Sequence, residues 1–451
     1  MASAAALLPN VERQRARFRF VLPLIALLAL VGFVTVRGNG VATAADTQAQ
    51  AEQYVRLALA LDRLHDGEVD GWFGPALPDQ PDPAIPHDPD GLDRAVTRLA
   101  ASLATPGKGA DEERRVHLRI LVRRLTGVMT IIGNSPSDDF YREAAHIYGL
   151  AEPTDAEAAH WKEARTQLDA LLPGEGPLVA RLEKFRSRFI VPLDSREALF
   201  TQALAECRAR TLAQWKLPAE ERLDLVWTAA VPAAWHRYEG NLRSVLRINR
   251  QALALPGQAM DLACHEAYPG HHAQFVLADA AAGPGGLPVE DRLTLLRSPE
   301  SVIREGAADF GVELVFPSGE RIAFLRDTLF PLAGLDPADA PLYARIEALE
   351  RTASGMSLPI LARYRDGTLS RAAAAAALAD EALVASPAAL LDFTDRYGAY
   401  VTGYTLARDR VRSGLTRNCG GSPWEPLRAL VEQPRAPPPY VLAAGFAVPS
   451  S

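Results

Sequence analysis

The segment on which the fold assignment depends is ACHEAYPGHHAQF, residues 263–275. The chain has nine histidines, and three of them, His265, His271 and His272, lie within eight positions. An HE pair followed by a further histidine is typical of zinc hydrolases, in which two imidazoles bind the metal and the glutamate is the general base. The segment therefore predicts a metal site, and the alternative is three structural histidines at a helix end.

The spacing of these histidines does not fit a regular helix. His271 would lie about 240° around the helix from His265 and about 9 Å along it, and His272 would lie about 10.5 Å along it. Two imidazoles that share one zinc need their nitrogens about 3 Å apart. Pro269 removes the N–H that the carbonyl of His265 would bond, and Gly270 tolerates the backbone angles of a break. We therefore expect an irregular turn that brings His271 back towards His265.

A third ligand is expected on a neighbouring helix, because a catalytic zinc has three protein ligands and one open position. The segment RSPESVIREGAADFGVELVF, residues 297–316, provides candidates. Ser298, followed by a proline, is a good helix N-cap. Glu305 lies in the second turn beside Gly306, which allows another backbone to approach closely. Asp309 shares the face of Glu305 one turn later, and a solvated acidic face is the alternative.

Most of the chain has a helical pattern. From about 50 to 220, apolar residues recur at i, i+3 and i+4, and helices return from 290 onward. Residues 228–255 instead alternate apolar and polar residues around the turn cluster Glu239-Gly240-Asn241, which predicts a β-hairpin. We expect a mainly α fold with one small hairpin.

The second strand of this hairpin, residues 244–249, is a candidate for substrate binding. If it forms a sheet edge beside the zinc helix, it can pair with an extended peptide backbone. Arg247 and Asn249 are then candidate substrate contacts. His236, before the turn, is interpreted as a hydrogen-bonded structural histidine.

The N-terminal segment, residues 1–45, differs from the rest of the chain. Arginines at 13, 15, 17 and 19 precede VLPLIALLALVGFVTV, residues 21–36, which carries no charge and is followed by the small residues Ala42 and Ala44. This pattern predicts a secretory signal or a retained membrane anchor, and the length of the apolar run favours the anchor. In both cases the chain beyond about residue 45 is exported.

The net charge and the cysteine content exclude some classes of function and bear on the cellular compartment. A net charge of −7 without a basic stripe gives no support for nucleic-acid binding. Three cysteines are too few for a disulfide framework. Cys207 and Cys264 are interpreted as buried apolar-like residues, and a bridge between Cys207 and Cys419 is the alternative in an oxidising compartment.

These motifs resemble a bacterial family known only as domain of unknown function 885, which is itself similar to the gluzincin metallopeptidases. The resemblance implies a gluzincin-like, bilobed helical fold. We expect an N-terminal helical lobe at 46–220, a metallohydrolase lobe at 221–432 and a proline-rich tail at 433–451. The matching segments are HEAYPGHHAQ (265–274), REG (304–306), YEGNLRSVLRIN (238–249), VDGWFGP (69–75) and YGAYVTGYTLAR (397–408).

The resemblance also assigns roles to residues of the histidine segment. It implies that His265, His271 and Glu305 bind zinc and that Glu266 is the general base. This chain departs from the family pattern just after Glu305, with Ala307 in place of the usual tryptophan and an aspartate two residues later where an apolar residue is common.

A hydrolase of this kind also needs a donor that stabilises the tetrahedral oxyanion. Tyr397, Tyr400 and Tyr404 recur at i, i+3 and i+7, one helical face, and a packed aromatic stripe is the alternative. Tyr404 is favoured as the donor because Gly403 flanks it, and Tyr400 is second. His272 is expected to contact the substrate or the ligands and not to bind the metal.

The expected function is zinc-dependent hydrolysis of peptides or small amides by a catalytic domain outside the cytoplasmic membrane, with Glu266 taking a proton from the attacking water. Two alternatives remain. One is a membrane-tethered binding protein that keeps the fold without turnover. The other is a metal-dependent hydrolase of non-peptide amides or esters.

Overall fold

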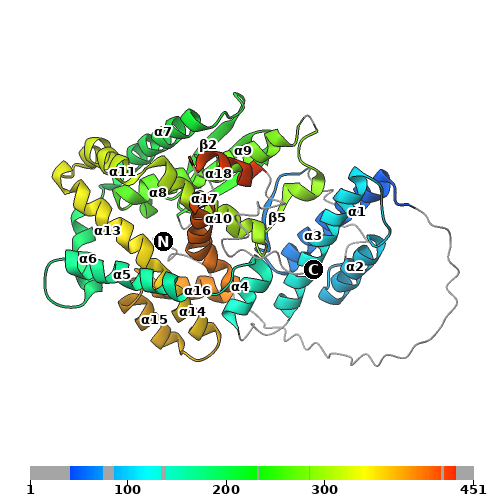
Figure 1. The fold of residues 1–451 in the computed structure, drawn as a ribbon, viewed down its shortest axis with the longest axis horizontal. Coiled ribbons are helices and arrows are strands. Elements are labelled where there is room, and N and C mark those ends of the chain that lie inside the picture. The colour runs from blue at the N-terminus through cyan, green and yellow to red at the C-terminus, as the bar shows by residue number, and fades with distance from the viewer. Residues whose placement is uncertain are drawn as a thin grey trace. The chain divides into compact units, whose positions relative to one another are not determined.

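The structure is a computed structural model that describes residues 41–74, 86–133, 139–230, 233–283, 285–417 and 421–432. Over these residues the chain is mainly α-helical with two small sheets, which confirms the predicted fold class (Figure 1). The apolar N-terminal run, the proline-rich tail and Cys419 lie outside the described residues. No helix among the described residues is both long enough and apolar enough to cross a membrane.

The described residues divide into two compact units. The first, called here the helical unit, contains the described residues between 41 and 133 together with 288–297. The second, called the site unit, contains those between 139 and 287 and between 298 and 432. This division differs from the expected boundary at residue 220, because helices before that residue pack against the histidine segment and the helices that follow it.

The helical unit is a three-helix core with a two-stranded sheet. Thr43 and Asp46 form a capping box at the start of its first helix. Apolar faces of the three helices form one core around residues such as Tyr54, Leu92 and Leu118. Its elements are α1 (Ala44–Leu64), α2 (Pro89–Ser102), α3 (Ala110–Gly133) and the antiparallel pair β1 (Val69–Trp72) and β5 (Leu293–Leu295).

The site unit holds the remaining helices. In Figure 1, α7, α8, α9 and β2 lie together, and α10 packs against both α8 and α17. These helices are α4 (Phe140–Tyr148), α5 (Asp155–Leu171), α6 (Leu178–Arg186), α7 (Arg196–Gln214), α8 (Pro256–Glu266), α9 (His271–Ala281), α10 (Pro299–Val315), α11 (Ser318–Phe324), α12 (Phe330–Ala333), α13 (Ala340–Ala353), α14 (Ser357–Arg365), α15 (Arg371–Asp380), α16 (Pro387–Tyr397), α17 (Leu406–Arg417) and α18 (Trp424–Glu432).

A three-stranded sheet completes the site unit. The predicted hairpin is confirmed as β3 (Ala234–Gly240) and β4 (Arg243–Ile248), which turn through Asn241 and Leu242, both with positive φ. A third strand, β2 (Arg222–Trp227), pairs with β4 in parallel, so the strand order is β2-β4-β3. The hairpin lies beside the histidine segment, because β3 contacts both α8 and α9.

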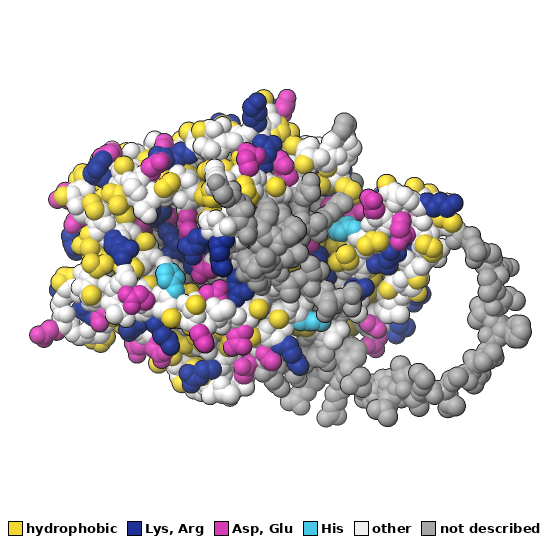
Figure 2. Space-filling view, viewed as in Figure 1, with side chains coloured by type: hydrophobic (Ala, Val, Ile, Leu, Met, Phe, Trp, Pro, Cys, Tyr) yellow, Lys and Arg dark blue, Asp and Glu magenta, His cyan; other side chains and the backbone are white. Residues whose placement is uncertain are grey.

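Charge on the visible face of the molecule is mixed. Lys and Arg side chains are interspersed with Asp and Glu side chains over the described residues shown in Figure 2. This distribution accords with the modest net charge of −7 over the whole chain.

Candidate metal centre

The predicted break in the histidine segment is confirmed. Helix α8 ends at Glu266 and α9 begins at His271, with Pro269 and Gly270 in the turn between them. A Cβ at Gly270 would lie 1.7 Å from the carbonyl oxygen of His265, so only glycine lets the chain pass so close. The turn brings the ring centroids of His265 and His271 to 4.8 Å, with the ring planes at 87°.

Glu305 approaches these imidazoles from α10. The helix begins where the sequence predicts, with the Ser298 hydroxyl accepting a hydrogen bond from the Ser301 N–H at 3.2 Å. A Cβ at Gly306 would lie 2.7 Å from the backbone carbonyl carbon of Ala407, so this glycine permits the close approach of α17. Glu305 is buried on this helix, with 8% of its surface exposed.

The three residues predicted as ligands meet in space. The candidate ligand atoms of His265, His271 and Glu305 all lie within 4.8 Å of one another. Nε2 of His265 is 3.3 Å from Oε2 of Glu305, and Nε2 of His271 is 3.6 Å from Oε1. Within the described residues, the buried Oε2 of Glu305 has this contact with His265 but no hydrogen bond of normal geometry. Three ligand atoms at these distances could hold one metal ion.

Two further residues hold the candidate ligands in place. Oδ1 of Asp309, which the sequence offered only as an alternative ligand, lies 2.8 Å from Nδ1 of His265. This contact leaves Nε2 of His265 to face Glu305. Tyr400, predicted as an oxyanion donor, donates its hydroxyl to Oε1 of Glu305 at 3.0 Å. Such contacts orient metal ligands in known metal centres.

The surroundings shift the pKa values of the two imidazoles in opposite directions. Burial alone lowers the pKa of His265, but the carboxylates of Asp309 and Glu305 outweigh it and raise that pKa well above its usual value. Burial lowers the pKa of His271 well below its usual value, and the positive charge of His265 adds to this effect. The carboxylates of Asp309 and Glu305 thus favour a positive charge on the His265 ring, which contacts both of them.

The other predicted catalytic residues lie close in sequence or space to this cluster. Glu266 is the last residue of α8 and is partly exposed. Tyr404 is partly exposed at the end of a 3₁₀ helix, Gly398–Tyr404, and its ring centroid is 5.8 Å from that of Tyr400. The predicted α-helical face of three tyrosines does not form, because Tyr397 ends α16 and the other two lie in the 3₁₀ helix.

His272 is not placed to contact a substrate. Adjacent positions on a helix point about 100° apart, and His272 is fully buried under the sheet. Its Nδ1 lies 2.8 Å from Oγ of Ser244, and its Nε2 lies 2.9 Å from Oε2 of Glu221. Burial alone would raise the pKa of Glu221, but hydrogen bonds from His272, Arg208 and Tyr268 lower it to about 2.

The strand that was predicted to bind substrate, residues 244–249, is not an edge of the sheet. Because β4 pairs on both sides, it is the central strand and has no edge for a peptide. Alternation along β4 puts Arg247 on the face opposite Ser244, where its guanidinium lies 4.8 Å from the ring centroid of Trp235. The Asn249 side chain accepts the Gln251 N–H at 3.0 Å and caps a short 3₁₀ turn. The Arg247 side chain therefore lies on the face of the sheet opposite Ser244, away from the metal centre. The Asn249 side chain caps a local turn.

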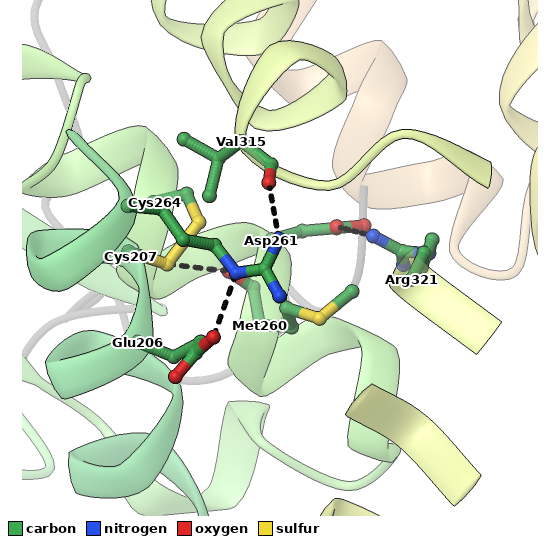
Figure 3. Close-up of a disulfide and its surroundings, with 8 residues drawn as sticks. Glu206, Cys207, Met260, Asp261, Cys264, Val315 and Arg321 are labelled. Carbon is green, nitrogen blue, oxygen red and sulfur yellow. Dashed lines mark hydrogen bonds and ion pairs between the residues drawn. A yellow bond between two sulfur atoms is a disulfide. The ribbon is translucent and has the colours of Figure 1, made fainter. Parts of the chain in front are cut away.

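A disulfide joins α8, the helix that carries His265, to the adjacent helix α7. Cys207 on α7 and Cys264 on α8 are bonded, with their Cα atoms 5.4 Å apart (Figure 3). The prediction of two separate packed thiols was wrong, because α7 and α8 pack side by side and bring the buried sulfurs together. Cys264 immediately precedes His265, so the bond fixes the end of α8 that carries this imidazole.

Comparisons with known proteins give one distant likeness. No protein-family model matches the chain, and no curated protein sequence matches it significantly. A solved structure described as "a putative lipoprotein of unknown function from Shewanella oneidensis" aligns over 78% of this chain and 70% of its own length, with 12% identity and a TM-score of 0.44. The resemblance to the domain of unknown function 885 and to gluzincins therefore rests on the motif residues.

Proposed function

We propose that this protein is a zinc-dependent hydrolase that cleaves peptide or amide bonds outside the cytoplasm. The observation that carries the proposal is the convergence of His265, His271 and Glu305, with all ligand atoms within 4.8 Å. Two imidazoles and one carboxylate form a donor set found in catalytic zinc sites, which keep a fourth position open.

The residues present fit such an ion. The buried Oε2 of Glu305 has no hydrogen bond of normal geometry within the described residues, although Nε2 of His265 lies 3.3 Å away. A cation held between these two atoms would satisfy both of them. His271 is neutral by its lowered pKa, as a metal-binding imidazole must be. Asp309 fixes Nδ1 of His265 and leaves Nε2 for the metal, the usual arrangement around a metal-bound histidine.

The surrounding residues support hydrolysis. A zinc ion held there would supply Lewis acidity, which polarises a scissile carbonyl and acidifies water. We assign Glu266, adjacent to His265 and partly exposed, as the base that takes a proton from the attacking water and passes it to the leaving amine. Because the Tyr400 hydroxyl is engaged with Glu305, Tyr404 is the favoured donor to the oxyanion.

The place of the substrate follows from the sheet. An extended peptide cannot add to the central strand β4, whereas β3 is an edge strand that contacts both α8 and α9. We therefore place the substrate backbone along β3. This replaces the expected pairing along residues 244–249.

Export from the cytoplasm is supported by the disulfide. A buried bond between Cys207 and Cys264 is expected in an oxidising compartment and is uncommon in the cytosol. This observation is independent of the apolar N-terminal run, which predicts the same location by either a signal or an anchor.

The test is metal analysis of the full-length protein followed by digestion of a peptide library with and without chelator. We expect about one zinc per chain, cleavage that chelator abolishes, and loss of cleavage in Glu266→Gln with zinc retained. Glu313→Gln, on α10 and paired with Arg412 at 3.2 Å, is the matched control and should cleave normally.

The same test separates the alternatives. A binding protein on this fold would show no turnover in the wild type or in either variant. A hydrolase of non-peptide compounds would leave the peptide library intact and cleave small esters or amides instead.

A further inference from the structure

An arginine on α10 lies beside the metal centre and takes no part in the hydrolysis proposed above. Arg304 is the residue before the candidate ligand Glu305. Its Cζ is 4.4 Å from the centroid of the Phe275 ring on α9, which is the distance of a cation–π contact. The arginine is partly exposed. It therefore adds a fixed positive charge to this part of the site unit.

The ring beneath Arg304 lies on the side of α9 that carries His271. Phe275 follows His271 by four residues on one helix, a spacing that puts two Cβ atoms about 5–6 Å apart on one face. The ring of His236 on β3 borders both, with its centroid 6.0 Å from that of His271 and 5.8 Å from that of Phe275. The Phe275 ring therefore lies about 5.4 Å, one helical turn, beyond the candidate ligand His271.

The same ring packs against the edge strand of the sheet. Phe275 stacks on two rings of β3, those of His236 and Tyr238, with interplanar angles of 19° and 11°. The substrate backbone is placed along this strand, and one residue of an extended chain spans about 3.3–3.6 Å. A substrate group one or two residues from the scissile bond is therefore within reach of Arg304.

The chemistry of the guanidinium determines which substrate group fits. Arginine keeps its charge at physiological pH and has five N–H donors in a planar fork. A guanidinium that packs on an aromatic ring can still donate hydrogen bonds through its edge. The fork matches the two oxygens of a carboxylate, and this charged pair is about twice as strong as a hydrogen bond between neutral groups.

We propose that Arg304 binds a carboxylate of the substrate, one or two residues from the bond that is cleaved. Two sources carry this group in a peptide. A carboxylate at the C-terminus would make the enzyme release the last one or two residues, and an aspartate or glutamate side chain would make it cleave beside acidic residues. The inference rests on the proposed function, because the cleaved bond lies beside His265, His271 and Glu305.

The test compares three peptides built around a bond that the peptide library shows to be cleaved. The first ends in a neutral amide. The second ends in a free carboxylate one or two residues after the bond, and the third is the amide with glutamate at that position. We expect the wild type to cleave the second or the third with a kcat/KM about 10- to 100-fold above that of the first. Preference for the second identifies a C-terminal carboxylate, and preference for the third identifies an acidic side chain.

Variants at position 304 assign this preference to the arginine. Arg304→Gln should remove the preference for the carboxylate. Arg304→Lys keeps the charge without the fork and should retain part of the preference. Arg188→Gln is the matched control and should keep the full preference, because Arg188 also packs on an aromatic ring, with its Cζ 5.2 Å from the Phe189 centroid, and pairs with Asp339 at 2.8 Å.

Three results would overturn the proposal. Equal kcat/KM for the three peptides in the wild type would do so whether or not any variant folds. A preference that persists in folded Arg304→Gln would show that another group binds the carboxylate. An equal loss of activity towards all three peptides in Arg304→Gln would show that Arg304 only packs on Phe275.

Peptide binding without turnover separates this inference from the proposed function. Three peptides of the same design, labelled at their N-termini with a fluorophore, are titrated into the metal-free, full-length protein and followed by anisotropy. A preference for a carboxylate that Arg304→Gln removes, in a protein that binds no zinc, would keep the role of Arg304 and refute the metal centre. A protein that binds zinc and cleaves all three peptides equally would keep the proposed function and refute the role of Arg304.

Discussion

Replacement of Asp309 by asparagine tests how the protein holds its first imidazole. Oδ1 of Asp309 lies 2.8 Å from Nδ1 of His265, and 14% of the His265 side chain is exposed. Asparagine keeps the shape of the side chain but removes the charge, and its amide can present a donor that favours the wrong tautomer. Loss of such a contact typically reduces metal affinity by about 10- to 100-fold, or about 1.4–2.7 kcal/mol.

The pH dependence of this effect has a definite sign. In the metal-free protein the carboxylates of Asp309 and Glu305 overcome burial and raise the pKa of His265, so zinc competes with a proton there and its affinity falls as pH falls through that pKa. Asp309→Asn removes one of these carboxylates and lowers the pKa of His265. The deficit in zinc affinity should therefore be largest at alkaline pH and smaller at acidic pH.

The assay is a zinc titration of the full-length protein against a chromophoric chelator at several pH values. Glu313→Gln is the control on the same helix, since Glu313 pairs with Arg412 and not with a candidate ligand. If Asp309→Asn binds zinc as tightly as the wild type at pH 8, the contact does not support the ligand and the reasoning fails.

Three other substitutions test the framework of the site. Gly270→Ala should abolish zinc binding, because its Cβ would lie 1.7 Å from a carbonyl oxygen, whereas Gly319→Ala, with open space around it, should bind normally in the same titration. The double variant Cys207→Ala, Cys264→Ala should lose up to ~4 kcal/mol of unfolding free energy, because the bond closes a loop between residues 57 positions apart. Reductant should shift the denaturation curve of the wild type but not that of the double variant. Burial would raise the pKa of Glu221, but its hydrogen bonds lower this pKa from 4.5 in the unfolded chain to about 2 in the folded protein. The ionised Glu221 therefore contributes fully to stability above about pH 4.5, and this contribution is lost as pH falls towards 2. Glu221→Gln should therefore flatten the dependence of the unfolding free energy on pH across that window, and an unchanged slope in acid denaturation would show that these hydrogen bonds do not lower the pKa.

The central part of the site could be predicted because its signals are local. Pro269 and Gly270 mark a helix break by their own backbone chemistry, and the break determines where His271 can lie. The N-cap at Ser298 sets the start of α10 and hence the position of Glu305. The Glu239-Gly240-Asn241 cluster similarly located the hairpin.

The parts that were wrong or missed depend on contacts between distant segments. The alternation in RLDLVW, residues 222–227, is a signal that could have found β2, but only the parallel pairing shows that β4 is central. The bond between Cys207 and Cys264 depends on how α7 and α8 pack. The contact of Glu221 with His272 likewise joins residues 51 positions apart, and no local pattern predicts it.

The family resemblance and the geometry each bear on which carboxylate is the third metal ligand. The resemblance selected Glu305 over Asp309 as the third ligand, and the structure places both next to His265 in distinct ways. Glu305 is within reach of both imidazoles, whereas Asp309 contacts the far nitrogen of one of them. Sequence spacing alone placed the two carboxylates on one face and could not separate these positions.

The most direct test of the central claim is the zinc content of the purified full-length protein, measured together with that of His265→Ala, His271→Ala and Glu305→Gln. We predict about one zinc per chain in the wild type, bound against a competing chelator, and a large loss of zinc in each of the three variants, with Glu313→Gln unchanged. A wild-type protein without zinc affinity, or zinc that stays bound in all three variants, would contradict the claim that these three side chains form a metal centre.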